Sequence, residues 1–129
     1  MAYGPPVRDR CYFVYALAPE GGSAREANER LNEYIGDRSR GIPVMHDHFI
    51  GAHGGFAVFH VRSEEELARL DDPGPLDGWR LDVHPLTYAV TAVGFAAQVD
   101  FTMESYGDTT LDQERAAEPP DKRYWWQAA

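Results

Sequence analysis

The stretch Cys11-Tyr-Phe-Val-Tyr-Ala-Leu17 is apolar at every position and rich in residues that favour strands. Because side chains of a strand alternate between two faces, a run without polar positions predicts a strand buried on both faces. A second run, Phe56 to Val61, also places apolar residues at both odd and even positions. These two segments predict the centre of a sheet that needs cover on either side.

Two helix starts can be recognised beside these strands. In Ser23-Ala-Arg-Glu26 and in Ser63-Glu-Glu-Glu66, a serine precedes a glutamate by three residues, which is the spacing of a capping box. After the first serine, apolar residues recur at intervals of three and four, which predicts a helix over 24–35 with Gly36 as a left-handed stop. The second helix is predicted to be short, since prolines follow it closely.

Two further strands complete the pattern. Residues 44–50 and 56–61 flank a glycine-rich turn and predict a β-hairpin, and 79–83 alternates apolar and polar side chains as a fourth strand. The order strand, helix, strand, strand, helix, strand indicates the α+β class. We expect a ferredoxin-like βαββαβ domain, in which two helices cover one face of a four-stranded antiparallel sheet.

The C-terminal part divides into a helix and a tail. Large apolar residues spaced by four, four and three predict a helix at about 92–106, ended by Gly107. Residues 108–129 are acidic and without helical period, and they finish in the aromatic cluster Tyr124-Trp125-Trp126. We therefore expect one domain over 1–107, which includes the C-terminal helix, and an extended tail over 108–129.

The net charge and the cysteine count limit the classes of binding partner and the compartment that we expect. Twelve Lys and Arg against twenty-one Asp and Glu give a formal net charge of -9, which repels phosphate backbones and anionic lipid head groups. Nucleic acid and membranes are thus poor partners. The single cysteine, Cys11, excludes an internal disulfide and fits a reducing compartment, and no apolar run reaches the length of a membrane span. We expect a cytoplasmic protein.

The two-sided strands raise the question of what covers the second face. Two helices cover only one face, so the other needs the C-terminal helix or the sheet of another subunit. In element order and in its two-sided strands, the chain over about residues 10–90 resembles the dimeric α+β barrel superfamily. That resemblance, which is architectural, implies a homodimer with a ligand-sized cavity. Members include monooxygenases, isomerases, haem-linked enzymes and ligand-sensing domains, so the reaction stays open.

Histidines form the one chemical cluster that the sequence suggests. His46 and His48 project to the same face of a regular strand and could bind one divalent metal ion, with His53 from the turn as a third ligand. Zinc, iron or manganese would suit such a site. Alternatively, His48 or His60 lines a cavity as a catalytic general base or hydrogen-bond donor. In a third interpretation these histidines are structural.

Two aromatic residues are candidates for a substrate pocket. Tyr15 lies in the middle of the first strand and Trp79 starts the fourth, and aromatic residues at such positions more often belong to the core than to a pocket. Three functions remain open at this point. The first is a homodimer that binds or transforms an apolar or aromatic small molecule, the second is a histidine-ligated metal enzyme, and the third is a non-enzymatic interaction module that uses the tail.

Overall fold

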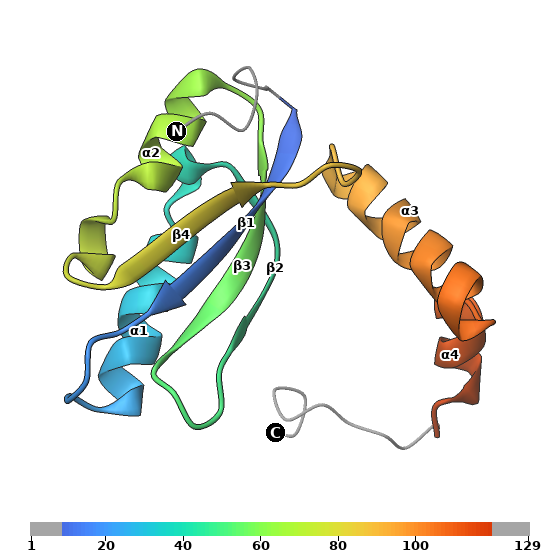
Figure 1. The fold of residues 1–129 in the computed structure, drawn as a ribbon, viewed down its shortest axis with the longest axis horizontal. Coiled ribbons are helices and arrows are strands. Elements are labelled where there is room, and N and C mark those ends of the chain that lie inside the picture. Colours follow the sequence, from blue (N-terminus) through green and yellow to red (C-terminus); the bar gives the residue numbers. More distant parts are fainter. Residues whose placement is uncertain (1–8, 120–129) are drawn as a thin grey trace. The chain divides into compact units, whose positions relative to one another are not determined.

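The computed structural model describes residues 9–119 and belongs to the α+β class. Its sheet has four antiparallel strands in the order β2-β3-β1-β4, as Figure 1 shows. The strands are β1 (Arg10–Leu17), β2 (Ile42–His48), β3 (Gly54–Val61) and β4 (Arg80–Pro85). Since each neighbouring pair is antiparallel, β1 and β2 run parallel with β3 between them, and β3 and β4 run parallel with β1 between them.

The helices α1 (Ala24–Ile35) and α2 (Glu64–Asp71) connect these parallel strands. The predicted bounds of the first helix are confirmed, and its N-cap Ser23 accepts a hydrogen bond from the Glu26 amide at 3.0 Å. At α2 the serine cap is also present, but the Glu66 carboxylate accepts from the Arg62 amide at 2.7 Å rather than closing a capping box. The left-handed stop was wrong, because Gly36 is right-handed with φ of -76° and donates its amide to Asn32 and Tyr34 carbonyls.

One face of the sheet carries the main core. Tyr12 and Val14 of β1 lie opposite Phe59 and Ala57 of β3, and all four are buried. Side chains from both helices close this face, so the expectation of two helices on one face is confirmed (Figure 1). The buried residues contributed by α1, α2 and the short turn η2 (Gly74–Leu76) are Leu31, Tyr34, Ile35, Leu70 and Leu76.

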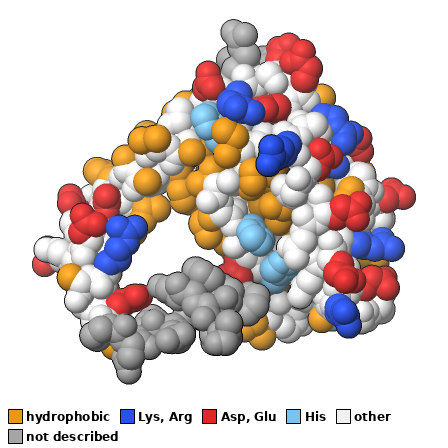
Figure 2. Space-filling view, turned by 180° about the vertical axis from the view of Figure 1, so that it is seen from behind, with side chains coloured by type: hydrophobic (Ala, Val, Ile, Leu, Met, Phe, Trp, Pro, Cys, Tyr) orange, Lys and Arg blue, Asp and Glu red, His pale blue; other side chains and the backbone are white. Residues whose placement is uncertain are grey.

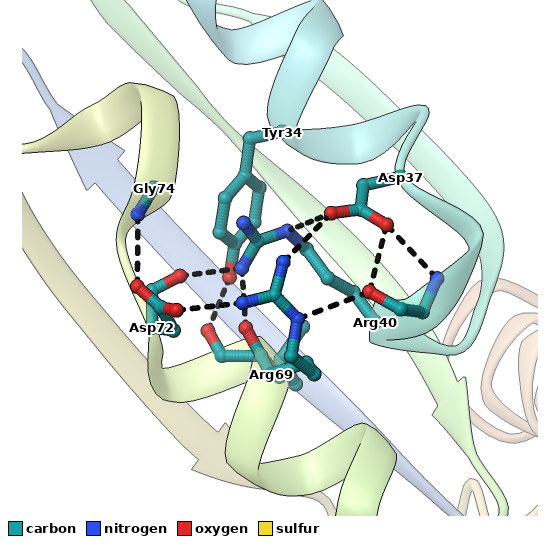
Figure 3. Close-up of polar contacts among 8 residues, drawn as sticks. Tyr34, Asp37, Arg40, Arg69, Asp72 and Gly74 are labelled. Atoms are coloured by element: carbon teal, nitrogen blue, oxygen red, sulfur yellow. Dashed lines mark hydrogen bonds and ion pairs between the residues drawn. The ribbon is translucent and has the colours of Figure 1, made fainter.

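A buried arginine joins the two helices at this face (Figure 3). The Arg40 side chain, 1% exposed, donates to the backbone carbonyls of Arg69 and Asp72 and lies 4.2 Å from the centre of the Tyr34 ring. The Tyr34 hydroxyl in turn donates to the Leu70 carbonyl at 2.5 Å. A buried cation is costly unless it is paired and hydrogen-bonded, so these contacts fix the end of α1 against the end of α2.

Within the described part of the first compact unit, side chains cover the opposite face at one end only. There Cys11 and Val58 are buried under Ala89, together with the partly buried Leu86 and Phe95. Backbone hydrogen bonds hold this segment to β1, from the Cys11 amide to the Ala89 carbonyl and from the Leu86 amide to the Cys11 carbonyl, each 3.0 Å long. The expectation that β1 is buried on both faces is therefore only half right, because side chains of its remaining length on this face are half-exposed.

The chain divides into two compact units after Phe95. The second contains most of α3 (Ala92–Thr102), the π-helical turn η3 (Met103–Gly107) and α4 (Leu111–Ala117). The helix predicted over 92–106 is present, although its last turn widens. The expectation of an extended tail from residue 108 was wrong for its described part, because Thr110 and Gln113 form a complete capping box that starts α4. The cluster Tyr124-Trp125-Trp126 lies outside the described residues.

The hairpin differs slightly from its prediction, and its first strand is irregular. β2 starts and ends two residues before the predicted 44–50, which leaves Phe49 and Ile50 in the turn. The pairing of β2 with β3 shifts register between Pro43 and Met45, as in a β-bulge. Because β2 pairs with β3 alone, this bulge and a proline lie in an edge strand. Over residues 9–119, no helix is both long and apolar enough to cross a membrane.

Candidate ligand-binding face

Four aromatic rings form a continuous cluster on the face of the sheet that α1 and α2 do not cover, which we call the open face. Phe13 stacks on Phe56 with ring centres 5.6 Å apart, and Phe56 lies 6.5 Å from Phe49. Phe49 also contacts Tyr15, at 5.4 Å. All four side chains are half-buried, so one side of the cluster remains accessible.

Strand register explains why these rings meet. Phe13 lies opposite Val58, and Tyr15 lies opposite Phe56 on the neighbouring strand, so their side chains share the face that Tyr12 and Val14 do not use. Phe49 reaches the cluster from the turn, where its amide donates to the Gly54 carbonyl at 2.8 Å. Hydrophobic side chains gather on part of the molecular surface in the view of Figure 2.

Polar side chains border the ring cluster along β4. Asp82 lies opposite Tyr15 and His84 lies opposite Phe13, which places both on the open face. The Arg80 guanidinium is 5.6 Å from the centre of the Tyr15 ring, and its Nε donates to Asp82 at 2.8 Å. The apolar ring cluster therefore has charged groups at its border, a combination of side chains that small-molecule sites also use.

His60 lies at the covered end of the open face. Its Nδ1 accepts a hydrogen bond from the Ala92 amide at 3.4 Å, and its Nε2 is 3.6 Å from a carboxylate oxygen of Asp9. Its neighbour across the strands is Cys11, whose thiol has a pKa raised by burial. His60 therefore holds the start of α3 to the sheet, and the thiol beside it is a packed, protonated side chain.

His46 and His48 lie on the other side of the sheet, facing α1. His48 is opposite Gly55, and its Nε2 is 3.1 Å from the amide oxygen of Asn32 in α1. The two imidazole rings meet edge to face with centres 5.6 Å apart. Burial, and then the charge of His46, lower the pKa of His48, so its neutral form is favoured near pH 7.

The predicted site residues are thus only partly brought together. His46 and His48 are neighbours as expected from their alternation, whereas His48 and His60 lie on opposite faces and cannot share one cavity. No group of three or more His, Cys, Asp and Glu side chains within residues 9–119 is placed to hold a metal ion, so no such group combines His53 with the histidine pair. The hypothesis of a three-histidine site therefore has no geometric support.

The two residues predicted to line a substrate pocket lie on opposite sides of the sheet. Tyr15 belongs to the ring cluster of the open face, whereas Trp79 packs against the core on the helix side. Sequence reasoning missed Phe49, because the predicted strand 44–50 contained it but did not give the register that sets it beside Tyr15 and Phe56. The available signal was the alternation that puts Phe13 and Phe56 on the face of Tyr15, which predicts a ring cluster before the turn residue is placed.

Comparison with known proteins adds no family to this geometry. No protein-family model matches the chain, and neither the curated proteins nor the solved structures contain a match.

Proposed function

We propose that this chain is a ferredoxin-like domain that acts as a homodimer and binds an apolar or aromatic small molecule on the open face of its sheet. The observation that carries the proposal is the half-buried ring cluster of Phe13, Tyr15, Phe49 and Phe56. The split order of the strands, with β3 between the parallel β1 and β2, supports the ferredoxin-like assignment.

The chemical character of the open face supports the class of ligand. Aromatic rings bind other planar rings by offset stacking and by burial of large apolar area. Arg80 and Asp82 at the border offer a donor and an acceptor, which would orient a polar substituent. A flat compound with one polar edge therefore matches this face better than a sugar or a nucleotide phosphate would.

Apolar surface elsewhere in the chain supports the proposal that a second copy of the chain covers exposed apolar side chains. Helix α3 has no buried residue, and most of its side chains are apolar, with Gln98 and Asp100 among the exceptions. Val93 is 81% exposed and Phe101 is 59% exposed. Helices that are mostly apolar are normally buried, and a self-association that covers such surfaces is the common solution.

The dimer can be tested with two variants that add the same charge. Phe56→Glu places a carboxylate in the ring cluster, and Asn28→Glu places one on the exposed side of α1. Sedimentation equilibrium should give the mass of two 14.5 kDa chains for the parent and Asn28→Glu, and of one chain for Phe56→Glu. A parent protein that stays monomeric at every concentration contradicts the homodimer.

Ligand binding can be tested with the fluorescent aromatic sulfonate 8-anilinonaphthalene-1-sulfonate. Removal of one ring by Tyr15→Ala should weaken its binding about tenfold, which corresponds to about 1.4 kcal/mol of lost contact. Tyr106→Ala removes an 85% exposed ring outside the cluster and should leave binding unchanged. Equal affinity in the parent and Tyr15→Ala would place the probe elsewhere. Near-ultraviolet circular dichroism checks that each variant keeps its packing.

A further inference from the structure

A pair of imidazoles and an amide oxygen meet where β2 passes α1. The rings of His46 and His48 are 5.6 Å apart and nearly perpendicular, at 83°. The amide oxygen of Asn32 lies 3.1 Å from His48 Nε2. The other ring nitrogen of His48, Nδ1, is buried and has no hydrogen-bond partner within residues 9–119. Figure 2 shows two histidine side chains next to each other at the surface.

These spacings agree with a shared metal ion. Nitrogen and oxygen ligands lie about 2.0–2.2 Å from zinc, so two ligands of one ion are separated by roughly 3.0–3.5 Å. Asn32 Oδ1 and His48 Nε2 form a hydrogen bond of 3.1 Å, which has the length of one such edge, so an ion bound to both atoms would replace the proton between them. Two imidazoles on one ion have their ring centres roughly 5–6 Å apart for the same reason, and the observed 5.6 Å falls in that interval.

The third donor differs from the one that the sequence suggested. His53 lies in the turn between β2 and β3, where its carbonyl accepts from the Ala18 amide at 2.8 Å. Asn32 instead comes from the helix that covers this side of the sheet, fourteen positions before His46 in the chain. An amide oxygen is a weaker metal ligand than an imidazole nitrogen. With the two imidazoles it would make three ligands, which leaves the fourth position of a tetrahedral ion open.

We propose that His46, His48 and Asn32 form a binding site for a transition-metal ion such as Zn²⁺ or Cu²⁺. Imidazole ligands suit both ions, and Cu²⁺ has the higher affinity for a given set of nitrogen and oxygen donors. The ion would join β2, an edge strand, to α1. Since the three ligands come together only in the folded chain, the ion stabilises the fold by mass action. The site lies on the opposite side of the sheet from the ring cluster and is independent of ligand binding there.

Metal titrations of untagged protein freed of metal by a chelator test the site. Electron paramagnetic resonance of the Cu²⁺ complex should show coupling to two imidazole nitrogens in the parent protein. His46→Ala and His48→Ala should each weaken Cu²⁺ and Zn²⁺ binding at least about tenfold, because loss of a group that only orients a ligand already lowers metal affinity by about 10–100-fold. His53→Ala is the matched control and should bind as the parent does.

The helix residue has its own pair of variants. Asn32→Ala should weaken metal binding, whereas Asn28→Ala, one turn earlier on the same helix, should not. Zn²⁺ should raise the thermal midpoint of the parent and of His53→Ala, but not that of His48→Ala. A parent spectrum with one imidazole nitrogen, or binding that falls as much in His53→Ala as in His48→Ala, overturns the proposal. Circular dichroism without metal verifies that every variant is folded.

Discussion

The two faces of the sheet are built from the same strands and differ in what covers them. On the helix side, Tyr12, Val14 and Phe59 are enclosed by α1 and α2, and a buried arginine ties the helices together. On the open side, Phe13, Tyr15 and Phe56 alternate with those residues along the chain but keep one side of their rings accessible. The difference predicts that the helix side contributes most of the stability, and it leaves the open side to the ligand binding proposed above.

The sharpest test of this contrast compares two phenylalanines of β3. Phe59→Ala removes a ring that is fully enclosed, at 0% exposure, and should lower the free energy of unfolding by about 3–5 kcal/mol. Phe56→Ala removes a half-buried ring and should cost about 1–2 kcal/mol, because less apolar area returns to water. Urea denaturation measures both. Equal losses of unfolding free energy in the two variants would contradict the prediction that the helix side contributes more to stability.

A second test concerns the arginine that joins the helices. Arg40→Met keeps a long apolar stem but leaves the carbonyls of Arg69 and Asp72 without their donor, which should cost about 3 kcal/mol. Arg69→Met is the matched control, since the Arg69 side chain is 43% exposed in its ion pairs with Asp37 and Asp72. That variant should lose about 1 kcal/mol or less in the same denaturation experiment. If the two variants lose the same free energy of unfolding, the buried Arg40 side chain does not hold the two helices together.

Two glycines test how tightly the arginine is enclosed. Gly74 and Gly78 both have positive φ, of 51° and 87°, so alanine is strained at either position. A Cβ at Gly74 would lie 2.6 Å from an Arg40 guanidinium nitrogen, whereas at Gly78 it would meet nothing within 4 Å. We expect Gly74→Ala to destabilise the fold by about 1 kcal/mol more than Gly78→Ala, because overpacking adds to the strain they share. Thermal denaturation of the two variants measures the difference.

The smallest expected effect depends on pH. Hydrogen bonds from the Ser39 hydroxyl and amide, followed by the Arg69 guanidinium, hold the pKa of Asp37 below its ordinary value. The unfolded carboxyl therefore takes up a proton at higher pH than the native one. Its stabilising contribution is present above about pH 4 and is lost as the pH falls through the native pKa. The stability difference between the parent and Asp37→Asn should shrink over that range, and a difference independent of pH would contradict this role.

Local patterns were sufficient where local interactions decide the structure. Ser23 and the apolar spacing after it predicted α1 with its observed bounds, because the cap and the buried stripe lie within one helix. The same reasoning should have found α4, since Thr110 and Gln113 have the spacing of a capping box. The absence of large apolar periodicity in this acidic segment concealed that signal.

Contacts between distant residues could not be predicted in this way. Arg40 looks like a solvent residue in the sequence, and its carbonyl partners lie 29 and 32 positions away. Asn32 likewise meets His48 only because α1 packs over β2, so the spacing of residues in the sequence suggests His53 as a neighbour of the pair and does not suggest Asn32. The ring cluster could be predicted only in part. Alternation along the first strand groups Phe13 with Tyr15, but it does not predict that Phe49 contacts Tyr15.

The irregular pairing of β2 restricts how this sheet can meet another protein. Continuous strand addition needs a straight rim with an unbroken series of amides and carbonyls, and here Pro43 lacks an amide hydrogen beside a register shift. At high protein concentration, the β2 edge therefore disfavours the addition of strands from other chains to this sheet. The proposed homodimer would instead use the broad aromatic side, where contact ends once two surfaces have met.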